Sequence, residues 1–251
     1  MSYQDKVIWI TGASSGIGAA LAQEFASRGA KLALSGRNLK ALEALKASMP
    51  TETKLYPFDV TDKAANQQAV TQIVQDFGRI DLAVLNAGIS HNVDLNHFQD
   101  AFEPLMQINF FGVVYGIDAL LKAFLPINQG HIAVISSIAS LGGLPASAAY
   151  CSSKAALKIM MESLQIDLAK TKIKTSIIYP GFIKTPLTDQ HDFKMPFIMS
   201  SEKAAKIMAD RLAKQQAQIY FPRFFAFLVR ALNVLPNAWY VKVIQRMKCK
   251  A

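Results

Sequence analysis

A glycine-rich turn between a strand-like run and a helical pattern constrains the fold of this chain more than any other feature. Residues 7–10 are all apolar and are β-branched or aromatic, as in a buried strand. The turn at residues 11–18 has the spacing G-x-x-x-G-x-G, and Ile17, Leu21 and Phe25 then recur at helical intervals. The free N–H groups and the dipole of a helix N-terminus can bind phosphate there. The sequence therefore predicts a site for the pyrophosphate of a dinucleotide.

The same turn also fits a second motif. Residues 12–16 match G-x-S-x-G, the nucleophile turn of many hydrolases. In those enzymes the motif follows several strands and precedes an acid and a histidine, whereas here it follows the first strand. The four histidines of the chain also lack an obvious triad context. We therefore favour dinucleotide binding over hydrolysis.

Strand-like runs alternate with helical patterns along the chain, and this alternation predicts a doubly wound, Rossmann-like α/β fold. The length of 251 residues, 51% of them hydrophobic, suits one such domain. We expect a seven-stranded parallel sheet flanked by helices in a dinucleotide-binding oxidoreductase domain at residues 1–222. A basic, hydrophobic helical extension is expected at residues 223–251. The seven strand-like runs are residues 7–10, 32–35, 54–58, 82–85, 132–136, 175–179 and 218–221.

Two side chains that can transfer or influence a proton, Tyr150 and Lys154, lie four positions apart in a helix-favouring stretch. Residues at this spacing project from one face of a helix. A free phenol has a pKa near 10, and a neighbouring ammonium group favours phenolate and lowers that pKa. Ser137 ends a strand-like run and can hold a substrate oxygen at the cofactor edge of the sheet. These residues predict acid–base catalysis beside a nicotinamide ring.

In their order and spacing, these motifs resemble those of the short-chain dehydrogenase/reductase family, over about residues 5–222. The form of the motifs is that of the NADP-preferring type. The matching motifs are Thr11-Gly12-x-x-x-Gly16-x-Gly18, Asn86-Ala87-Gly88, Asn109, Ser137, Tyr150-x-x-x-Lys154 and Pro180-Gly181-x-x-x-Thr185.

The resemblance implies a role for each of four catalytic residues. Tyr150 is the general acid for ketone reduction and the general base for alcohol oxidation. Lys154 lowers the pKa of that tyrosine and binds the nicotinamide ribose. Ser137 orients the substrate oxygen, and Asn109 holds a water molecule that links Lys154 to solvent.

The resemblance also implies a set of cofactor-binding residues. The Asn86-Ala87-Gly88 turn supports the central sheet near the adenine ribose, and Asp59 and Val60 contact adenine. The backbone of Ile183 and the side chain of Thr185 meet the carboxamide. The full set is Gly12, Ser14, Ser15, Gly16, Ile17, Gly18, Arg37, Asp59, Val60, Asn86, Ala87, Gly88, Tyr150, Lys154, Pro180, Gly181, Ile183 and Thr185. No metal site is expected.

The end of the second strand-like run indicates which cofactor is preferred. NAD-binding sites usually carry an acidic residue there, which accepts hydrogen bonds from the adenosine ribose. This chain has Gly36 followed by Arg37, so a 2′-phosphate meets no repulsion and can be bound by a guanidinium group. Ser14 can add a hydrogen bond, whereas Ser15 stands where many NADP-dependent relatives carry a second basic residue. We expect NADP(H) to be preferred over NAD(H).

The net charge of +9 is concentrated at the C-terminus. Residues 211–251 carry eight Lys and Arg side chains and no acidic residue, among many large apolar side chains. Pro236 is expected to divide this segment into two short helices. The segment can pack over the substrate pocket or a subunit interface, or it can lie on an anionic membrane surface. Nucleic-acid binding is disfavoured because so many of its residues are large and aliphatic.

The leading functional interpretation is NADP(H)-dependent hydride transfer to or from a carbonyl or secondary alcohol. An apolar substrate is suggested by a loop at residues 186–200 that contains Phe193, Phe197 and Met199. The alternative is a non-catalytic NADP-binding redox sensor or scaffold. The resemblance further implies a homodimer or homotetramer formed through the helices that carry Asn109 and Tyr150.

The sequence also bears on localisation. The first strand-like run begins within ten residues of Met1, so we expect no cleaved signal peptide of ordinary length. The two cysteines, Cys151 and Cys249, are far apart and are expected to be free thiols in a reducing cytosol. We expect a cytoplasmic protein. If the C-terminal segment lies on a membrane, we expect peripheral attachment to the inner membrane surface.

Overall fold

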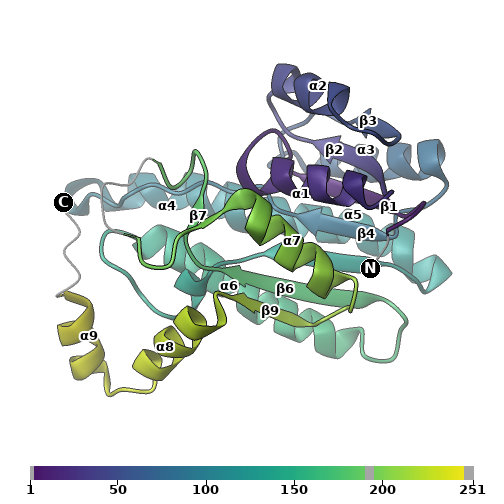
Figure 1. The fold of residues 1–251 in the computed structure, drawn as a ribbon. Helices are drawn as coiled ribbons and strands as arrows, with labels where there is room; N and C mark the ends of the chain where they lie inside the picture. Colours follow the sequence, from purple (N-terminus) through teal and green to yellow (C-terminus); the bar gives the residue numbers. More distant parts are fainter. Residues whose placement is uncertain (1–2, 190–194, 246–251) are drawn as a thin grey trace.

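The computed structural model describes residues 3–189 and 195–245, and its centre is a seven-stranded parallel sheet (Figure 1). The strand order is β3-β2-β1-β4-β5-β6-β9, and every neighbouring pair is parallel. The predicted doubly wound α/β fold is therefore confirmed. The strands are β1 (Val7–Thr11), β2 (Lys31–Ser35), β3 (Thr53–Leu55), β4 (Leu82–Leu85), β5 (His131–Ile135), β6 (Lys174–Pro180) and β9 (Gln218–Phe221).

The chain builds one half of the sheet outward from β1 and then returns to β4 on the other side of β1. In open α/β sheets, such a reversal leaves a crevice at the carboxyl ends of the strands, where ligands bind. The third strand ends earlier than predicted, at Leu55 rather than residue 58. Pro57 has no N–H group to donate to a ladder, which helps to end the pairing with β2.

Helices cover both faces of the sheet, and the alternation of side chains along β1 shows why. Ile8 and Ile10 pack with α1 and α7 on one face, whereas Val7 and Trp9 pack with α3, α5 and α6 on the other. Figure 1 shows α1 and α7 in front of the sheet. The helices of this domain are α1 (Gly16–Ser27), α2 (Leu39–Ala47), α3 (Lys63–Phe77), α4 (Phe98–Met106), α5 (Gly112–Ile127), α6 (Ala148–Asp167) and α7 (Ser201–Leu212).

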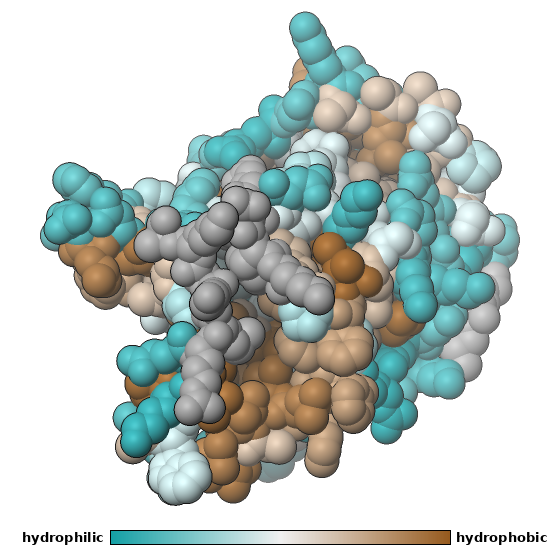
Figure 2. Space-filling view, turned by 60° about the vertical axis from the view of Figure 1, so that its left-hand side comes forward, coloured by the Kyte–Doolittle hydropathy of each residue, from teal (hydrophilic) through white to brown (hydrophobic). Residues whose placement is uncertain are grey.

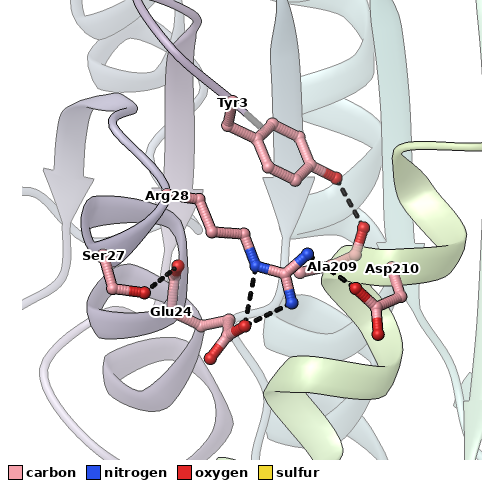
Figure 3. Close-up of polar contacts among 6 residues, drawn as sticks. All are labelled: Tyr3, Glu24, Ser27, Arg28, Ala209 and Asp210. Carbon is pink, nitrogen blue, oxygen red and sulfur yellow. Dashed lines mark hydrogen bonds and ion pairs between the residues drawn. The ribbon is translucent and has the colours of Figure 1, made fainter. Parts of the chain in front are cut away.

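Arg28 links the two helices that cover the front face. Its guanidinium group bonds Glu24, one turn earlier in the chain, and Nη1 lies 2.6 Å from Oδ1 of Asp210 on α7. Next to it, the hydroxyl of Tyr3 donates to the carbonyl oxygen of Ala209 at 2.7 Å (Figure 3). The Arg28 side chain is largely buried but that of Asp210 is half exposed, so the ion pair is a partly screened link between α1 and α7.

Helix α5 belongs to a longer helical run. The run Leu95–Ile127 is long and apolar enough to cross a membrane, judged by length and composition alone. Among the described residues, one run meets this criterion. It comprises η1 (Leu95–His97), α4, the π-helical turn η2 (Gln107–Phe111) and α5. Helix α5 buries Val113, Leu120 and Phe124 against the sheet. We therefore interpret the run as a core element of the α/β fold.

Two further helices follow β9, as predicted, and flank Pro236: α8 (Arg223–Asn233) and α9 (Asn237–Gln245). They project from the lower edge of the sheet in Figure 1. Ala226 of α8 and Ile244 of α9 are buried, so each helix has one face packed on the protein. The extension therefore packs on the domain through part of its surface.

Candidate active site

The glycine turn between β1 and α1 is packed so tightly that a side chain on Gly12 or Gly18 would force neighbouring atoms to shift. A Cβ atom on Gly18 would lie 2.2 Å from the carbonyl oxygen of Gly12. One on Gly12, whose φ is +64°, would lie 2.8 Å from Cα of Ala87. The Nδ2 group of Asn86 donates to the carbonyl oxygens of Thr11 and Gly12, each at 3.1 Å. The turn therefore presents bare backbone at the start of α1, as a pyrophosphate site requires.

The turn opens into a cavity of about 510 Å³ at the carboxyl edge of the sheet. Of the expected site residues, all but Gly18 and Asn109 line it. The expected residues in its wall are Gly12, Ser14, Ser15, Gly16, Ile17, Arg37, Asp59, Val60, Asn86, Ala87, Gly88, Ser137, Tyr150, Lys154, Pro180, Gly181, Ile183 and Thr185. The fold thus brings segments that are far apart in the sequence to one cleft.

Tyr150 and Lys154 lie on successive turns of α6. The Nζ atom of Lys154 is 5.8 Å from the centre of the Tyr150 ring and donates to the carbonyl oxygen of Ile135 at 3.0 Å. Burial lowers the pKa of Lys154 to about 8. That bond to the end of β5 therefore holds a desolvated cation at the floor of the cleft.

The tyrosine differs from the expectation drawn from the sequence. Burial raises the pKa of Tyr150 to about 12, and a hydrogen bond with Ser137 acts in the opposite direction without reversing the shift. In the protein alone, the net pKa of Tyr150 therefore lies above its ordinary value, whereas the sequence led us to expect a value below it. The free-energy cost of transferring a phenolate from water into the buried site exceeds the stabilisation that the surrounding polar groups provide.

Ser137 follows β5 and begins the short helix η3 (Ile138–Leu141). Its Oγ atom accepts a hydrogen bond from the N–H of Ala139 at 3.1 Å, which fixes the hydroxyl at the end of the strand. The neighbouring Ser136 donates from Oγ to the carbonyl oxygen of Lys154 at 3.0 Å. Ser136 thus joins the end of β5 to α6, while the local bond of Ser137 orients its hydroxyl.

Asn109 lies in the π-helical turn η2 and is fully buried. Its Nδ2 group donates to the carbonyl oxygen of Ile89 and to Oγ of Ser153, at 2.9 and 3.2 Å, and its Oδ1 atom accepts from the N–H of Ile89 at 2.8 Å. A Cβ atom on Gly88 would lie 3.2 Å from Asn109 Oδ1 and 3.4 Å from Lys154 Nζ. Asn109 therefore clamps the segment after β4 beside Lys154 without lining the cavity itself.

Arg37 lies at the opposite end of the cleft, just after β2. Its side chain is 66% exposed, and Nη1 lies 3.6 Å from Oδ2 of Asp59. Burial acts to raise the pKa of Asp59, but hydrogen bonds from Thr61 and the nearby guanidinium group hold it below its usual value. Ser14 lies beside Gly36, whose added Cβ would be 3.4 Å from the serine Oγ. A cation and a hydroxyl thus flank the mouth of the cleft.

The described residues contain no cluster of three or more side chains that could hold a metal ion. A sequence model of the short chain dehydrogenase family matches residues 6–195, which is more than half of the chain. The chain belongs to the short-chain dehydrogenase/reductase family. It is accordingly an NAD(P)-dependent oxidoreductase.

Similar proteins agree with this membership. An oxidoreductase of Myxococcus xanthus is 32% identical over 252 residues, covering 99% of both chains, so the alignment includes the C-terminal extension. The crystal structure of a Burkholderia phymatum short-chain dehydrogenase/reductase in complex with NAD has a TM-score of 0.84 at 22% identity, covering 100% of this chain and 98% of that one. An alcohol dehydrogenase from Thermococcus sibiricus, complexed with 5-hydroxy-NADP, has a TM-score of 0.76 at 25% identity, covering 86% and 94%.

For this dehydrogenase/reductase, the cavity also has lining residues outside the expected set of site residues. Each lies within three positions of a member of that set, so proximity to a motif was the available signal. These residues are Gly36, Asn38, Phe58, Ile89, Ile108, Ile135, Ser136, Pro186, Leu187 and Thr188.

The expected substrate loop is only partly placed at the cavity of this dehydrogenase/reductase. Leu187 lines the cavity, but Met199 belongs to a short strand, β8 (Met199–Ser200), and packs against the core under α7. This strand pairs with β7 (Ile183–Lys184), which pulls Met199 inward. Phe193 lies outside the described residues. Phe197 contacts α8, as described below.

Proposed function

We propose that this chain is an NADP(H)-dependent oxidoreductase that interconverts an apolar carbonyl compound and its secondary alcohol. The observation that carries the proposal is the convergence of Ser137, Tyr150 and Lys154 on the cavity that begins at the glycine turn. A cofactor-binding scaffold alone does not need a phenol and an amine in that place. The redox-sensor alternative is therefore disfavoured.

The glycine turn fits a dinucleotide because Gly12 and Gly18 pack so tightly against neighbouring protein atoms that no Cβ fits, which keeps bare backbone at the cavity wall beside the start of α1. Gly12, Gly16 and the start of α1 would hold the pyrophosphate, with Lys154 at the nicotinamide ribose. When bound, the nicotinamide supplies or accepts the hydride.

The protein's own residues manage the oxygen and the proton. Ser137 holds the substrate oxygen, and Tyr150 donates a proton to it during reduction or removes one during oxidation. With a pKa raised to about 12, the phenol is protonated at neutral pH, which suits its role as the acid in reduction. The ammonium of Lys154 stabilises the phenolate that forms when the proton leaves.

The cofactor preference rests on the residues after β2. Arg37 is exposed at the cavity wall, and the neighbouring residue is glycine rather than an acid. A guanidinium group binds a 2′-phosphate through paired, charge-assisted hydrogen bonds. Solved relatives contain both NAD and an NADP derivative, so the choice lies in this chain's own residues.

The apolar substrate is supported by side chains around the inner end of the cavity. Ile89, Ile108 and Leu187 line it. Outside this lining, Phe182 follows Gly181 in the chain, and its ring centre is 5.8 Å from that of Phe225 on α8. An apolar wall of this kind favours a hydrophobic carbonyl compound over a sugar.

We further propose a homodimer or homotetramer in the cytoplasm, formed through α5 and α6. The outer face of α6 exposes Ile159 and Ile166, at 63% and 74%; these two residues lie seven positions apart on one side of the helix, where a second copy would cover them. Light scattering of the purified protein measures the subunit number.

A carbonyl panel tests the proposed function. The purified protein is assayed with NADPH and with NADH against aliphatic ketones, polycyclic ketones and sugars of similar size. We expect a higher kcat/KM with NADPH and with the apolar ketones. Cofactor binding without turnover across the panel would favour the sensor alternative, and a preference for sugars would contradict the substrate class.

A further inference from the structure

Helix α8 has two apolar faces, although only one of them packs on the protein. Phe225, Ala226 and Val229 face the core beside η3 and β9. On the other side, Phe224 and Phe227 are 62% and 66% exposed. The exposed apolar residues Phe224, Phe227, Leu228 and Ala231 have the spacing i, i+3, i+4, i+7 of a single helical stripe.

Helix α9 and the turn before it extend this exposed surface. Tyr240 and Ile244 face inward, and the hydroxyl of Tyr240 donates to the carbonyl oxygen of Gly143 at 2.7 Å. Val234 and Trp239 are 85% and 68% exposed. Figure 2 shows hydrophobic surface gathered on the lower part of the molecule, where these helices lie. We call this surface the tail patch: Phe224, Phe227, Leu228, Ala231, Val234, Leu235, Trp239 and Val243.

Exposed cations border the tail patch. Arg223, Arg230 and Lys242 are exposed on the same two helices, and residues 211–251 contain no acidic side chain to neutralise them. Arg230 lies over the Tyr220 ring, 4.2 Å from its centre, and donates to the Tyr220 hydroxyl at 2.9 Å. Its charge is thereby held at the edge of the patch.

The charge distribution decides between two coverings of this patch. In a twofold dimer the same surface meets itself, so the cations of both copies would be brought together without counter-charges. An anionic bilayer instead accepts Phe, Leu and Trp at its acyl boundary and attracts Arg and Lys to its headgroups. We propose that the tail patch docks this protein on an anionic lipid surface.

The patch adjoins two segments that flank residues of the proposed active site in the sequence. The ring of Phe197, in the segment before β8, lies 5.9 Å from Phe224 and 5.8 Å from Phe225. Gly142 and Gly143, between Ser137 and Tyr150, contact α8 and α9. Docking would therefore place the substrate loop at the bilayer. Delivery of substrate from the lipid rests on the proposed function, whereas docking itself does not.

Vesicle binding tests the proposal with the full chain and without any substrate. The protein is mixed with vesicles of phosphatidylcholine alone or with one-third phosphatidylglycerol, and floated on a density gradient. Trp9 is fully buried and Trp239 is exposed, so a blue shift of tryptophan fluorescence reports burial of Trp239. We expect flotation and a blue shift with the anionic vesicles, both weakened by salt.

Matched variants locate the binding surface. Phe227→Ser should weaken binding about tenfold and Arg223→Gln about fivefold. Leu95→Ser and Lys170→Gln, which remove an exposed apolar side chain and an exposed cation elsewhere, should leave binding unchanged. Circular dichroism confirms folding, and Trp239→Phe should keep flotation but lose the blue shift.

Three results would overturn the proposal. The first is equal recovery of the wild type with neutral and anionic vesicles, and the second is equal recovery of Phe227→Ser and wild type. The third is a change in subunit number for Phe227→Ser without loss of vesicle binding, which would assign the patch to another copy of the chain. A protein that shows no turnover but still floats with anionic vesicles would contradict the proposed function and leave the docking proposal standing.

Discussion

The ammonium nitrogen of Lys154 lies 5.8 Å from the centre of the Tyr150 ring, one helical turn away on α6. It also donates to the carbonyl oxygen of Ile135 at the end of β5. The amine is thus held by the sheet, and both groups are carried by the same helix, four positions apart. Several expectations depend on this arrangement.

Tyr150→Phe should abolish most of the turnover while leaving the cofactor affinity nearly unchanged. The substitution removes the transferable proton and keeps the ring, and general acid–base catalysis contributes about 10² to 10⁴ in rate. Steady-state kinetics with NADPH and a ketone measures kcat, and fluorescence titration measures cofactor binding. Tyr115→Phe, on α5, is the matched control. If kcat of Tyr150→Phe stayed near the wild-type value, Tyr150 would not be the acid.

The folded protein should gain stability relative to Lys154→Met as the pH rises from about 8 to 10.5. Burial lowers the pKa of Lys154 from 10.5 to about 8, so in this window the unfolded chain binds a proton that the folded chain has released. The free energy of unfolding therefore rises with pH for the wild type, by at most about 1.4 kcal/mol per pH unit. Lys154→Met lacks this contribution.

Urea unfolding of the cofactor-free proteins at several pH values between 7 and 10.5 measures the effect. The difference between the two proteins isolates Lys154, because the other titrating groups are common to both. A difference that is flat across the window would show that Lys154 keeps its ordinary pKa.

Gly18→Ala should weaken cofactor binding at least tenfold and lower the melting temperature. The added Cβ would lie 2.2 Å from a backbone oxygen of Gly12, so the turn itself must move. Calorimetric titration with NADPH and a thermal melt measure both effects. Gly143→Ala is the control, since its Cβ would meet nothing within 4 Å. Equal affinity of Gly18→Ala and wild type would place the pyrophosphate elsewhere.

Arg37→Asp should lower the affinity for NADPH by about tenfold or more. The affinity of the variant for NADH should equal or exceed that of the wild type. The change replaces a phosphate-binding cation by a carboxylate that can accept hydrogen bonds from the ribose. Titration with both cofactors gives the ratio of the two affinities. Lys206→Asp, on the exposed side of α7, controls for the change in net charge. An unchanged ratio would remove the basis for NADP preference.

Features within one contiguous segment were predictable from the sequence. The turn at residues 11–18 and the pair Tyr150 and Lys154 are examples, because the periods of strands and helices convert spacing along the chain directly into local geometry. The parallel, doubly wound sheet was predictable as well, since alternating strands and helices allow few topologies. The two helices on either side of Pro236 were predicted for the same local reason.

Properties that depend on distant segments were not predictable in this way. Asn109 was named, but its clamp on Ile89 and Ser153 depends on how η2 packs beside α6. Met199 was expected near the substrate and instead is partly buried against the core under α7. Composition marked the C-terminal extension as apolar, yet which of the two apolar faces of α8 is exposed depends on its contacts with η3 and β9.

By itself, then, the sequence determined the sheet, the glycine turn and the residues able to move a proton. Tertiary structure decided where those residues meet, how deeply they are buried and which apolar surface remains in water. The pKa of Tyr150 illustrates the difference: spacing places an amine nearby, but desolvation by the assembled cleft raises the pKa to about 12. Desolvation depends on every group that excludes water, and those groups come from segments that only folding brings together.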